Sequence, residues 1–234
     1  MFVLALNPAL VGAVSAEKQP VTIPKPDCSD FAAWLRYIAS AEALARQEAE
    51  QNLAQGGLPG FRLFQSVPSG DAHILQCVFG PSMKFRLDEL SSGQIALIIL
   101  ETALAVASER HGVLVLDEPG NFLGLGEIHP LLTRLQDAAL EGRFQVIMTA
   151  YHPIAVDFLA AGYGSWLERE ASGPTRVQRI HVSDEAADEK LGVRVSDLIA
   201  RGWLSGIGIG QPVPSPETDA ERAADLLLPK PPTE

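Results

Sequence analysis

The sequence predicts an α/β protein in which helices flank a sheet, and two observations carry this prediction. The first is alternation, because strand-like and helix-like segments follow one another from residue 113 to about residue 160, in the order strand, helix, strand, helix. The second is a short, continuous apolar run over residues 113–116, which is typical of a buried strand. Alternating strands and helices pack as a sheet with helices against it, so the fold class follows.

The N-terminal part of the chain predicts an entry segment and then one helix. Residues 1–26 contain apolar stretches that prolines interrupt, which suits a strand or loop entering a domain begun elsewhere. Ser29 or Asp30 is a suitable N-cap for the helix. Apolar residues then follow at helical spacing: Phe31, Trp34, Leu35 and Ile38. Gly56, Gly57 and Pro59 end this segment, so we predict a single amphipathic helix.

The middle of the chain predicts a hairpin and a long apolar helix. The segments "FRLFQSV" and "HILQCVF" alternate as strands do, and "PSGD" supplies the turn between them. The helix opens at Ser91-Ser92-Gly93 and ends near Arg110 and Gly112.

The second half continues with a helix closed by Gly142, a strand "FQVIMTAY", and a turn and helix "HPIAVDFLA". Short strands are expected within residues 163–183 and a helix over 191–204. Residues 205–234 are rich in proline and polar side chains, so we expect this tail to be mostly disordered.

Composition excludes some classes of function. A chain of 234 residues with 47% hydrophobic content can bury a core, and its length suggests one domain with appendages. The formal net charge of -11 leaves nucleic-acid binding possible but unsupported by charge. Cys28 and Cys77 lie far apart without a CxxC pattern, so neither a zinc site nor a disulfide is indicated.

The apolar N-terminus imitates a secretory signal peptide, with "AVSA" in place of a cleavage site. It has no Lys or Arg before the apolar run, however, and Asn7-Pro8 interrupts that run. No apolar stretch approaches the roughly 20 residues that a membrane span needs. We therefore expect a cytoplasmic protein without a membrane span.

Two adjacent carboxylates, Asp117 and Glu118, end the most apolar predicted strand. Such a pair carries a desolvation cost and mutual repulsion, so it usually persists because a cation or a reaction occupies the site. The obvious cation is magnesium on a nucleotide. The alternative is an acidic turn at a strand end, with Pro119 as the residue that breaks the strand.

The stretch "LSSGQ", with Ser91 to Gln94, precedes the long apolar helix. A helix N-terminus presents unpaired N–H groups and a partial positive charge, so this stretch could cradle an anion. Ser91 and Ser92 add hydroxyl donors. Taken alone, an ordinary N-cap before a core helix explains the same residues.

The order of these motifs resembles the C-terminal part of an ABC-type ATPase, most closely the RecF/SMC-like AAA-family ATPases. "LSSGQ" resembles the signature motif, "VLVLDEP" resembles Walker B, and "TAYHP" lies where the switch histidine sits. The resemblance covers roughly residues 20–204. It implies a P-loop NTPase sheet flanked by helices, with residues 1–26 as an entry segment, 27–204 as the ATPase lobe and 205–234 as a tail.

The resemblance also implies roles and cofactors, ATP and Mg²⁺. Asp117 would hold magnesium through its water shell, and Glu118 would orient or deprotonate the attacking water. The signature residues would contact the γ-phosphate of an ATP held by a second subunit: Ser91, Ser92, Gly93 and Gln94. Asn121 occupies the place of the D-loop at the dimer interface of such ATPases.

Two departures from the family pattern matter. The phosphate-binding loop GxxxxGK[ST] is absent, because none of the lysines follows a glycine, so the N-terminal lobe with its Q-loop glutamine is missing. At the switch position, alignment on the proline places Tyr151 at the histidine and His152 one residue late. Successive residues leaving a strand point to opposite sides, so His152 could instead be a surface or capping group.

Three interpretations follow. The chain is the C-terminal part of an ATPase whose P-loop lobe is missing by truncation, gene splitting or a misassigned start, and which works as a homodimer or with a partner chain that carries this lobe. Alternatively, it is a degenerate module that keeps the fold and a partner interface without turnover. The third is an unrelated α/β hydrolase-type or structural protein, which no GxSxG or metal-ligand cluster supports. We expect the isolated chain to be inactive, and the sequence does not identify an effector function.

Overall fold

The computed structural model describes residues 1–16, 20–169, 173–180 and 194–200, and it confirms the α/β class. The chain divides into two compact units, Met1–Ala155 and Val156–Glu234. The described residues do not include the predicted tail over 205–234. Of the helix predicted over 191–204, they include only residues 194–200.

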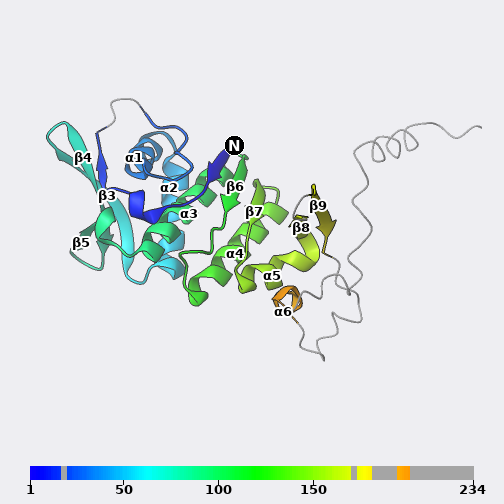
Figure 1. Cartoon of the computed structure of the whole chain (residues 1–234). Helices are drawn as coiled ribbons and strands as arrows, with labels where there is room; N and C mark the ends of the chain where they lie inside the picture. Colours follow the sequence, from blue (N-terminus) through cyan, green and yellow to red (C-terminus); the bar gives the residue numbers. More distant parts are fainter. Residues whose placement is uncertain (17–19, 170–172, 181–193, 201–234) are drawn as a thin grey trace, which may run out of the picture. The chain divides into compact units, whose positions relative to one another are not determined.

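Three parallel strands form the central sheet of the first unit, in the order β1-β6-β7 (Figure 1). Their bounds are β1 Phe2–Leu4, β6 Val113–Asp117 and β7 Gln145–Thr149. The expected entry segment thus supplies a strand of this sheet. Leu4 of β1 pairs with Leu116 of β6, which in turn pairs with Met148 of β7.

One face of this sheet is buried against two helices, α3 (Ser92–Glu109) and α4 (Leu125–Leu140). Leu114 and Leu116 of β6 are each 1% exposed, and α3 contacts β6 while α4 contacts β7. Gly142 closes α4 as predicted, in the left-handed region with φ +72°, where glycine carries no Cβ penalty.

Helix α3 is the center of the core. In the described part of the chain it is the one helix long and apolar enough to cross a membrane, but 78% of it is buried inside the protein. Length and hydropathy alone do not separate a core helix from a membrane span, and this degree of burial is that of a core helix.

A buried ion pair joins α3 to α4. Glu101 of α3 is fully buried and accepts a hydrogen bond from the Arg134 guanidinium of α4. Burial raises the pKa of Glu101, and the hydrogen bond and charge of Arg134 offset part of that rise. Arg134 therefore offsets part of the cost of burying this carboxylate.

A second, antiparallel sheet follows the order β2-β4-β3, with β5 paired to β4. The strands are β2 Val14–Ser15, β3 Phe61–Ser69, β4 Ala72–Phe79 and β5 Met83–Arg86. The predicted hairpin is confirmed, because Ser69 pairs with Ala72 across the turn. Cys28 and Cys77 are both free and buried, and burial raises the pKa of each thiol to about 12.

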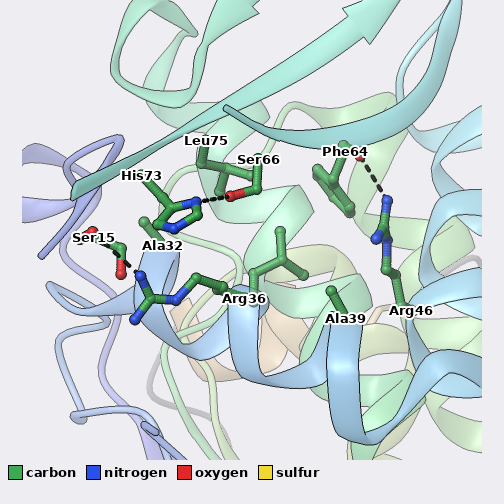
Figure 2. A pocket seen from close by; sticks show the side chains of 10 residues that line it. Ser15, Ala32, Arg36, Ala39, Arg46, Phe64, Ser66, His73 and Leu75 are labelled. Carbon is green, nitrogen blue, oxygen red and sulfur yellow. Dashed lines mark hydrogen bonds between the residues drawn. The ribbon is translucent and has the colours of Figure 1, made fainter. Parts of the chain in front are cut away.

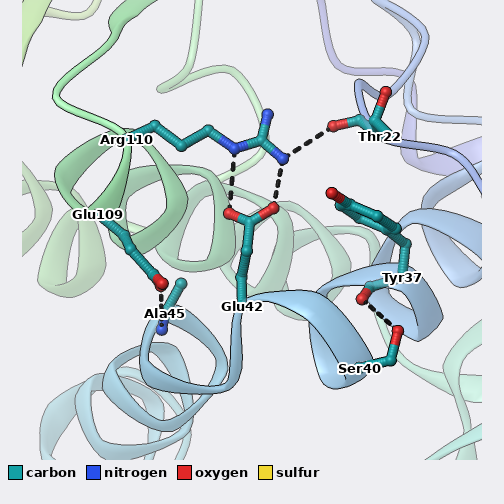
Figure 3. A network of polar contacts seen from close by, with 7 residues as sticks. All are labelled: Thr22, Tyr37, Ser40, Glu42, Ala45, Glu109 and Arg110. Carbon is teal, nitrogen blue, oxygen red and sulfur yellow. Dashed lines mark hydrogen bonds and ion pairs between the residues drawn. The ribbon is translucent and has the colours of Figure 1, made fainter.

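The single helix predicted after residue 30 is wrong. The chain forms α1 (Phe31–Ala41) and α2 (Ala43–Asn52), followed by a π-helical segment, Leu53–Gly57. The two helices are separated at Glu42, which has φ -137° and ψ 59°. The Glu42 carboxylate accepts a hydrogen bond from the Arg110 guanidinium and forms an ion pair with it (Figure 3). Asp30 does not cap α1 with its side chain, since its carboxylate accepts the Lys25 N–H instead.

The second unit has its own small core. It holds the greater part of α5 (Pro153–Tyr163), the antiparallel hairpin of β8 (Ser165–Arg169) and β9 (Thr175–Arg179), and α6 (Val195–Ala200). Ala160, Ile180 and Val195 are its buried residues. Asp157 fixes the start of α6, because its carboxylate accepts hydrogen bonds from the N–H and the hydroxyl of Ser196.

The Glu101–Arg134 pair gives a stability prediction. Arg134→Leu leaves a buried carboxylate without its charged partner and should lower the free energy of unfolding at neutral pH by about 3 kcal/mol or more. The loss should be smallest at low pH, where Glu101 is protonated in both folded proteins, and should grow as pH rises past the raised folded pKa, since only the parent then has Arg134 to favour the ionised form. Urea unfolding at several pH values measures this.

The double variant Glu101→Leu/Arg134→Leu is the control, because it removes both charges and should recover most of the lost stability. A loss in Arg134→Leu that is small and independent of pH would contradict the assignment.

Candidate functional site

The candidate site lies at the carboxyl end of the parallel sheet, where Asp117 is the last residue of β6. Thr149, the last residue of β7, is its register partner, and the Thr149 hydroxyl donates a hydrogen bond of 2.6 Å to Asp117 Oδ1. The side chain of Asp117 is exposed to solvent. One oxygen of this carboxylate is thus held in place while the group stays accessible to a ligand.

Glu118 is held in a strained backbone conformation directly after the strand. Its φ of +49° lies in the left-handed region, which an ordinary side chain seldom adopts. The N–H of Glu118 donates to the Thr149 hydroxyl at 3.0 Å, and Glu118 Oε2 accepts the N–H of Tyr151 at 3.2 Å. These bonds fix both carboxylates against the end of β7.

Thr149 is the residue that sequence reasoning missed. Its hydroxyl accepts the backbone N–H of Glu118 and donates to the Asp117 carboxylate, so it ties the Asp117 side chain to the backbone of the next residue. Its position in the sequence was the available signal. Thr149 ends the strand that follows the one ending in Asp117, and the carboxyl ends of neighbouring parallel strands meet at one edge of the sheet.

The stretch from Ser91 to Gln94 forms a capping box at the start of α3. The Ser91 hydroxyl accepts the Gln94 N–H at 3.3 Å, and Gln94 Oε1 accepts the Ser91 N–H at 2.9 Å. Ser91 is therefore the N-cap of α3, which is the alternative to an anion site that the sequence left open. Ser91 and Ser92 are nonetheless exposed, and the N–H groups of Ser92 and Gly93 lie where a helix provides no internal acceptor.

Gly93 brings the start of α3 against the segment that follows the carboxylates. A Cβ at this position would lie 2.8 Å from the carbonyl oxygen of Phe122, so only glycine fits. Asn121, at the expected D-loop position, is exposed and donates its N–H to the Glu118 carbonyl at 3.1 Å. The Ser91–Gln94 stretch and the Asp117–Glu118 turn are thus neighbours within one chain.

The structure separates the two residues proposed for the switch position. Tyr151 is 83% exposed, and it is its backbone N–H that reaches Glu118. His152 is half-buried, with its Cβ 3.3 Å from where a Cβ on Gly120 would lie. Its Nδ1 accepts the N–H of Ile154 at 3.3 Å, so the imidazole caps the first turn of α5.

A pocket lies elsewhere in the first unit, between α1 and the antiparallel sheet (Figure 2). Its polar side chains bond to neighbouring groups: Arg46 donates to the Phe64 carbonyl, and His73 Nδ1 lies 3.3 Å from the Ser66 hydroxyl. None of the sequence-predicted site residues lines it. This pocket is therefore separate from the candidate site.

The donor set at the sheet edge fits magnesium on a nucleotide better than a metal held by protein alone. Within the described residues there is no group of three or more His, Cys, Asp or Glu that could hold a metal ion. Magnesium retains several waters and is usually bound by one or two carboxylates plus substrate phosphates. An exposed Asp117 beside the Thr149 hydroxyl meets that requirement.

No family profile and no curated protein matches the chain. Among solved structures, one from a study of ATP-driven dimerization and DNA-stimulated activation of SMC ATPases has a TM-score of 0.47 and 14% identity, and the match covers 68% of this chain and 94% of that one. An Smc head domain with a coiled coil and joint from Pyrococcus yayanosii has a TM-score of 0.42 and 16% identity. That match covers 70% of this chain and 30% of the other. Such a likeness concerns partial architecture alone, so any chemistry of this chain rests on its own residues.

The left-handed backbone of Glu118 gives a prediction that compares two variants. Glu118→Gly and Glu118→Ala both remove the carboxylate and its bond to Tyr151, and they differ in whether a Cβ must occupy the strained conformation. We expect the Gly variant to be more stable than the Ala variant by about 1 kcal/mol, as measured by urea unfolding. Equal stabilities, or a more stable Ala variant, would show that Glu118 is not held at positive φ.

Proposed function

We propose that this chain is the signature-bearing and Walker B-bearing part of an ABC-type ATPase that resembles the RecF/SMC-like group, and that it needs a phosphate-binding lobe from elsewhere for turnover. The observation that carries the proposal is the arrangement at the end of β6, where Thr149 holds an exposed Asp117 and an adjacent Glu118. The motif order in the sequence and the contact between Gly93 and Phe122 add support.

In this proposal each carboxylate has a separate task. Asp117 would hold the magnesium of a bound ATP, and this ion would supply charge neutralisation at the phosphates. Glu118, fixed by the Tyr151 N–H, would orient water for attack and accept its proton. Thr149 would act as a positioning residue, because its hydroxyl holds the Asp117 carboxylate and the backbone N–H of Glu118.

The Ser91–Gln94 stretch would face the γ-phosphate of an ATP bound to a second subunit. The exposed hydroxyls of Ser91 and Ser92 and the free N–H groups at the start of α3 suit an oxyanion. The capping box is compatible with this task, because it orients the first turn of the helix. ATP-dependent dimerisation would then bring the signature of one chain to the nucleotide of the other.

A second candidate function is a module that binds a partner without hydrolysis. Two observations favour it: the switch position holds the exposed Tyr151, and His152 is engaged in capping α5. The absent GxxxxGK[ST] motif is common to both proposals. They differ in one respect, which is whether a supplied lobe restores turnover that depends on Glu118.

The proposal predicts the behaviour of the isolated chain. Without a loop to cradle the phosphates, the purified chain with Mg²⁺ and ATP should release phosphate no faster than buffer. A phosphate-release assay measures this. Turnover that Glu118→Gln abolishes would mean that the chain holds the phosphates by other residues.

With the P-loop lobe supplied, as a separate chain or an upstream extension, two variants should differ. Glu118→Gln should reduce hydrolysis by roughly a hundredfold or more and trap an ATP-bound dimer, since water is no longer activated. Ser91→Arg should prevent the dimer, because its side chain fills the phosphate cradle, whereas Ser66→Arg, at an exposed position of β3, is the control and should dimerise normally. Size-exclusion chromatography with light scattering, with and without ATP, measures whether each variant forms the dimer. If Ser91→Arg dimerises normally and Glu118→Gln hydrolyses at the parent rate, both assignments fail. If the supplied lobe restores no turnover in the parent chain, the non-hydrolysing module is the function that remains.

A further inference from the structure

The longest described strand, β3, lies at the edge of the antiparallel sheet. Among the residues that the structure describes, β3 pairs with β4 alone, so the other side of this nine-residue strand faces away from the sheet. An edge strand presents a row of N–H and C=O groups that can pair with another chain. What these groups contact therefore decides whether the sheet can be extended.

The register shows which backbone groups of β3 point outward. In an antiparallel pair, the N–H and C=O groups of successive residues face the partner strand and the opposite side in turn. Leu75 donates its N–H to the Ala13 carbonyl, away from β3, and its register partner is Ser66. Ser66 therefore points its own backbone groups outward, and so do the residues two positions away, Phe64 and Pro68.

Two side chains of α2 bind the backbone of Phe64 on this outer side. Glu50 Oε1 accepts the Phe64 N–H at 2.9 Å. Arg46 Nη2 donates to the Phe64 carbonyl at 2.6 Å (Figure 2). Arg46 and Glu50 also bond to each other, with the Arg46 Nε 2.9 Å from the Glu50 Oε1. This ion pair satisfies the outward donor and acceptor of Phe64, as a neighbouring strand would.

The helix that carries the pair holds it against β3. Arg46 and Glu50 are four residues apart, so they lie on the same side of α2, and α2 contacts β3. Their side chains are 30% and 18% exposed, and Phe64 itself is 3% exposed. Charged groups that bond to a backbone and are largely removed from water hold more strongly than an exposed ion pair. We call this arrangement of Arg46, Glu50 and the Phe64 backbone the latch.

A proline protects the other end of the edge. Pro68 has no N–H to donate, so of the three outward residues only Ser66 has an N–H that neither the latch nor a proline removes. The sequence of β3 shows why protection is needed, because residues 61–67, "FRLFQSV", contain one charged side chain and no glycine or proline. A segment with high strand propensity and low charge self-associates readily when its edge is exposed.

We propose that the latch keeps β3 from pairing with β3 of a second copy of this chain. In a twofold antiparallel pairing centred on Ser66, Phe64 of each copy faces Pro68 of the other. Each copy would then donate two hydrogen bonds, from the N–H of Phe64 and from the N–H of Ser66. The latch occupies the first of these donors, so half of the bonds are lost while it is closed. This inference is independent of the proposed function.

A second strand beside Phe64 would need the place that α2 occupies. Helix α2 therefore has to leave the edge before two copies pair, and the hydrogen bonds of Arg46 and Glu50 to Phe64 hold it there. An extended segment of another protein would need the same opening. The low charge and high strand propensity of β3 itself favour a second copy, which purified chain alone can supply.

Amide hydrogen exchange of the full chain, followed residue by residue by NMR, tests whether the latch closes the edge. Glu50→Ala removes the acceptor, so the Phe64 amide should exchange roughly tenfold faster or more. Glu50→Gln keeps an oxygen at the same place and should preserve most of the protection. Gln65 and Val67 point their N–H groups toward β4 and should stay protected in every variant, which shows that the hairpin remains folded.

The matched control is Glu48→Ala, which removes a glutamate from the same helix. Glu48 forms an ion pair with Arg143 rather than with the β3 backbone, so its loss also breaks an ion pair of α2 but leaves the latch intact. The exchange rate of the Phe64 amide should then equal that of the parent. A Phe64 amide that is unchanged in Glu50→Ala, or that exchanges equally fast in Glu48→Ala, would overturn the latch.

Sedimentation velocity of the purified chain without nucleotide tests whether a second copy is the partner. Arg46→Ala/Glu50→Ala should self-associate with a dissociation constant at least about tenfold lower than that of the parent, because two more hydrogen bonds become available. The Ser66 amide should become protected as the concentration of this variant rises. A double variant that stays monomeric wherever the parent does would overturn the proposal. Association that leaves the Ser66 amide unprotected would overturn it too, since the contact would then lie away from the β3 edge.

Discussion

The register between β6 and β7 is the constraint on which the rest of the structure depends. It pairs Leu116 with Met148 on the face under α3 and α4, and it pairs Asp117 with Thr149 at the carboxyl end. Because side chains alternate, a slip of one residue would turn Asp117 toward the helices and Leu116 toward solvent. A single pairing thus fixes which face packs against the helices and where the carboxylates are held.

Around this register the chain builds the parts of the site that its sequence contains. Glu118 accepts a left-handed backbone, and its bonds to Thr149 and Tyr151 keep it there. Strain of this kind persists where surrounding contacts over-determine it, and it is frequent at functional sites. Gly93 then lets the start of α3 lie against Phe122, so a shift of α3 would also displace the segment that follows the carboxylates.

Local patterns were sufficient to predict much of this from the sequence. The hairpin, the long apolar helix and the acidic strand end follow from periodicity, turns and caps, which act over a few residues. The break at Glu42 could not be predicted in this way, because the contact that holds Glu42 is an ion pair with Arg110, which lies 68 residues away. The link through Thr149 was missed for the same reason, since it depends on strand register rather than on neighbours in sequence.

The central claim is that the carboxylate edge of this chain is one part of a nucleotide site that another lobe completes. Calorimetric titration of Mg²⁺-ATP into the purified chain tests it most directly, because affinity in such a site comes largely from the loop that cradles the phosphates. The account predicts weak binding, with a Kd of roughly 1 mM or above, near 4 kcal/mol of binding free energy. A Kd in the low micromolar range or below would contradict it, because the chain would then hold ATP without a second lobe.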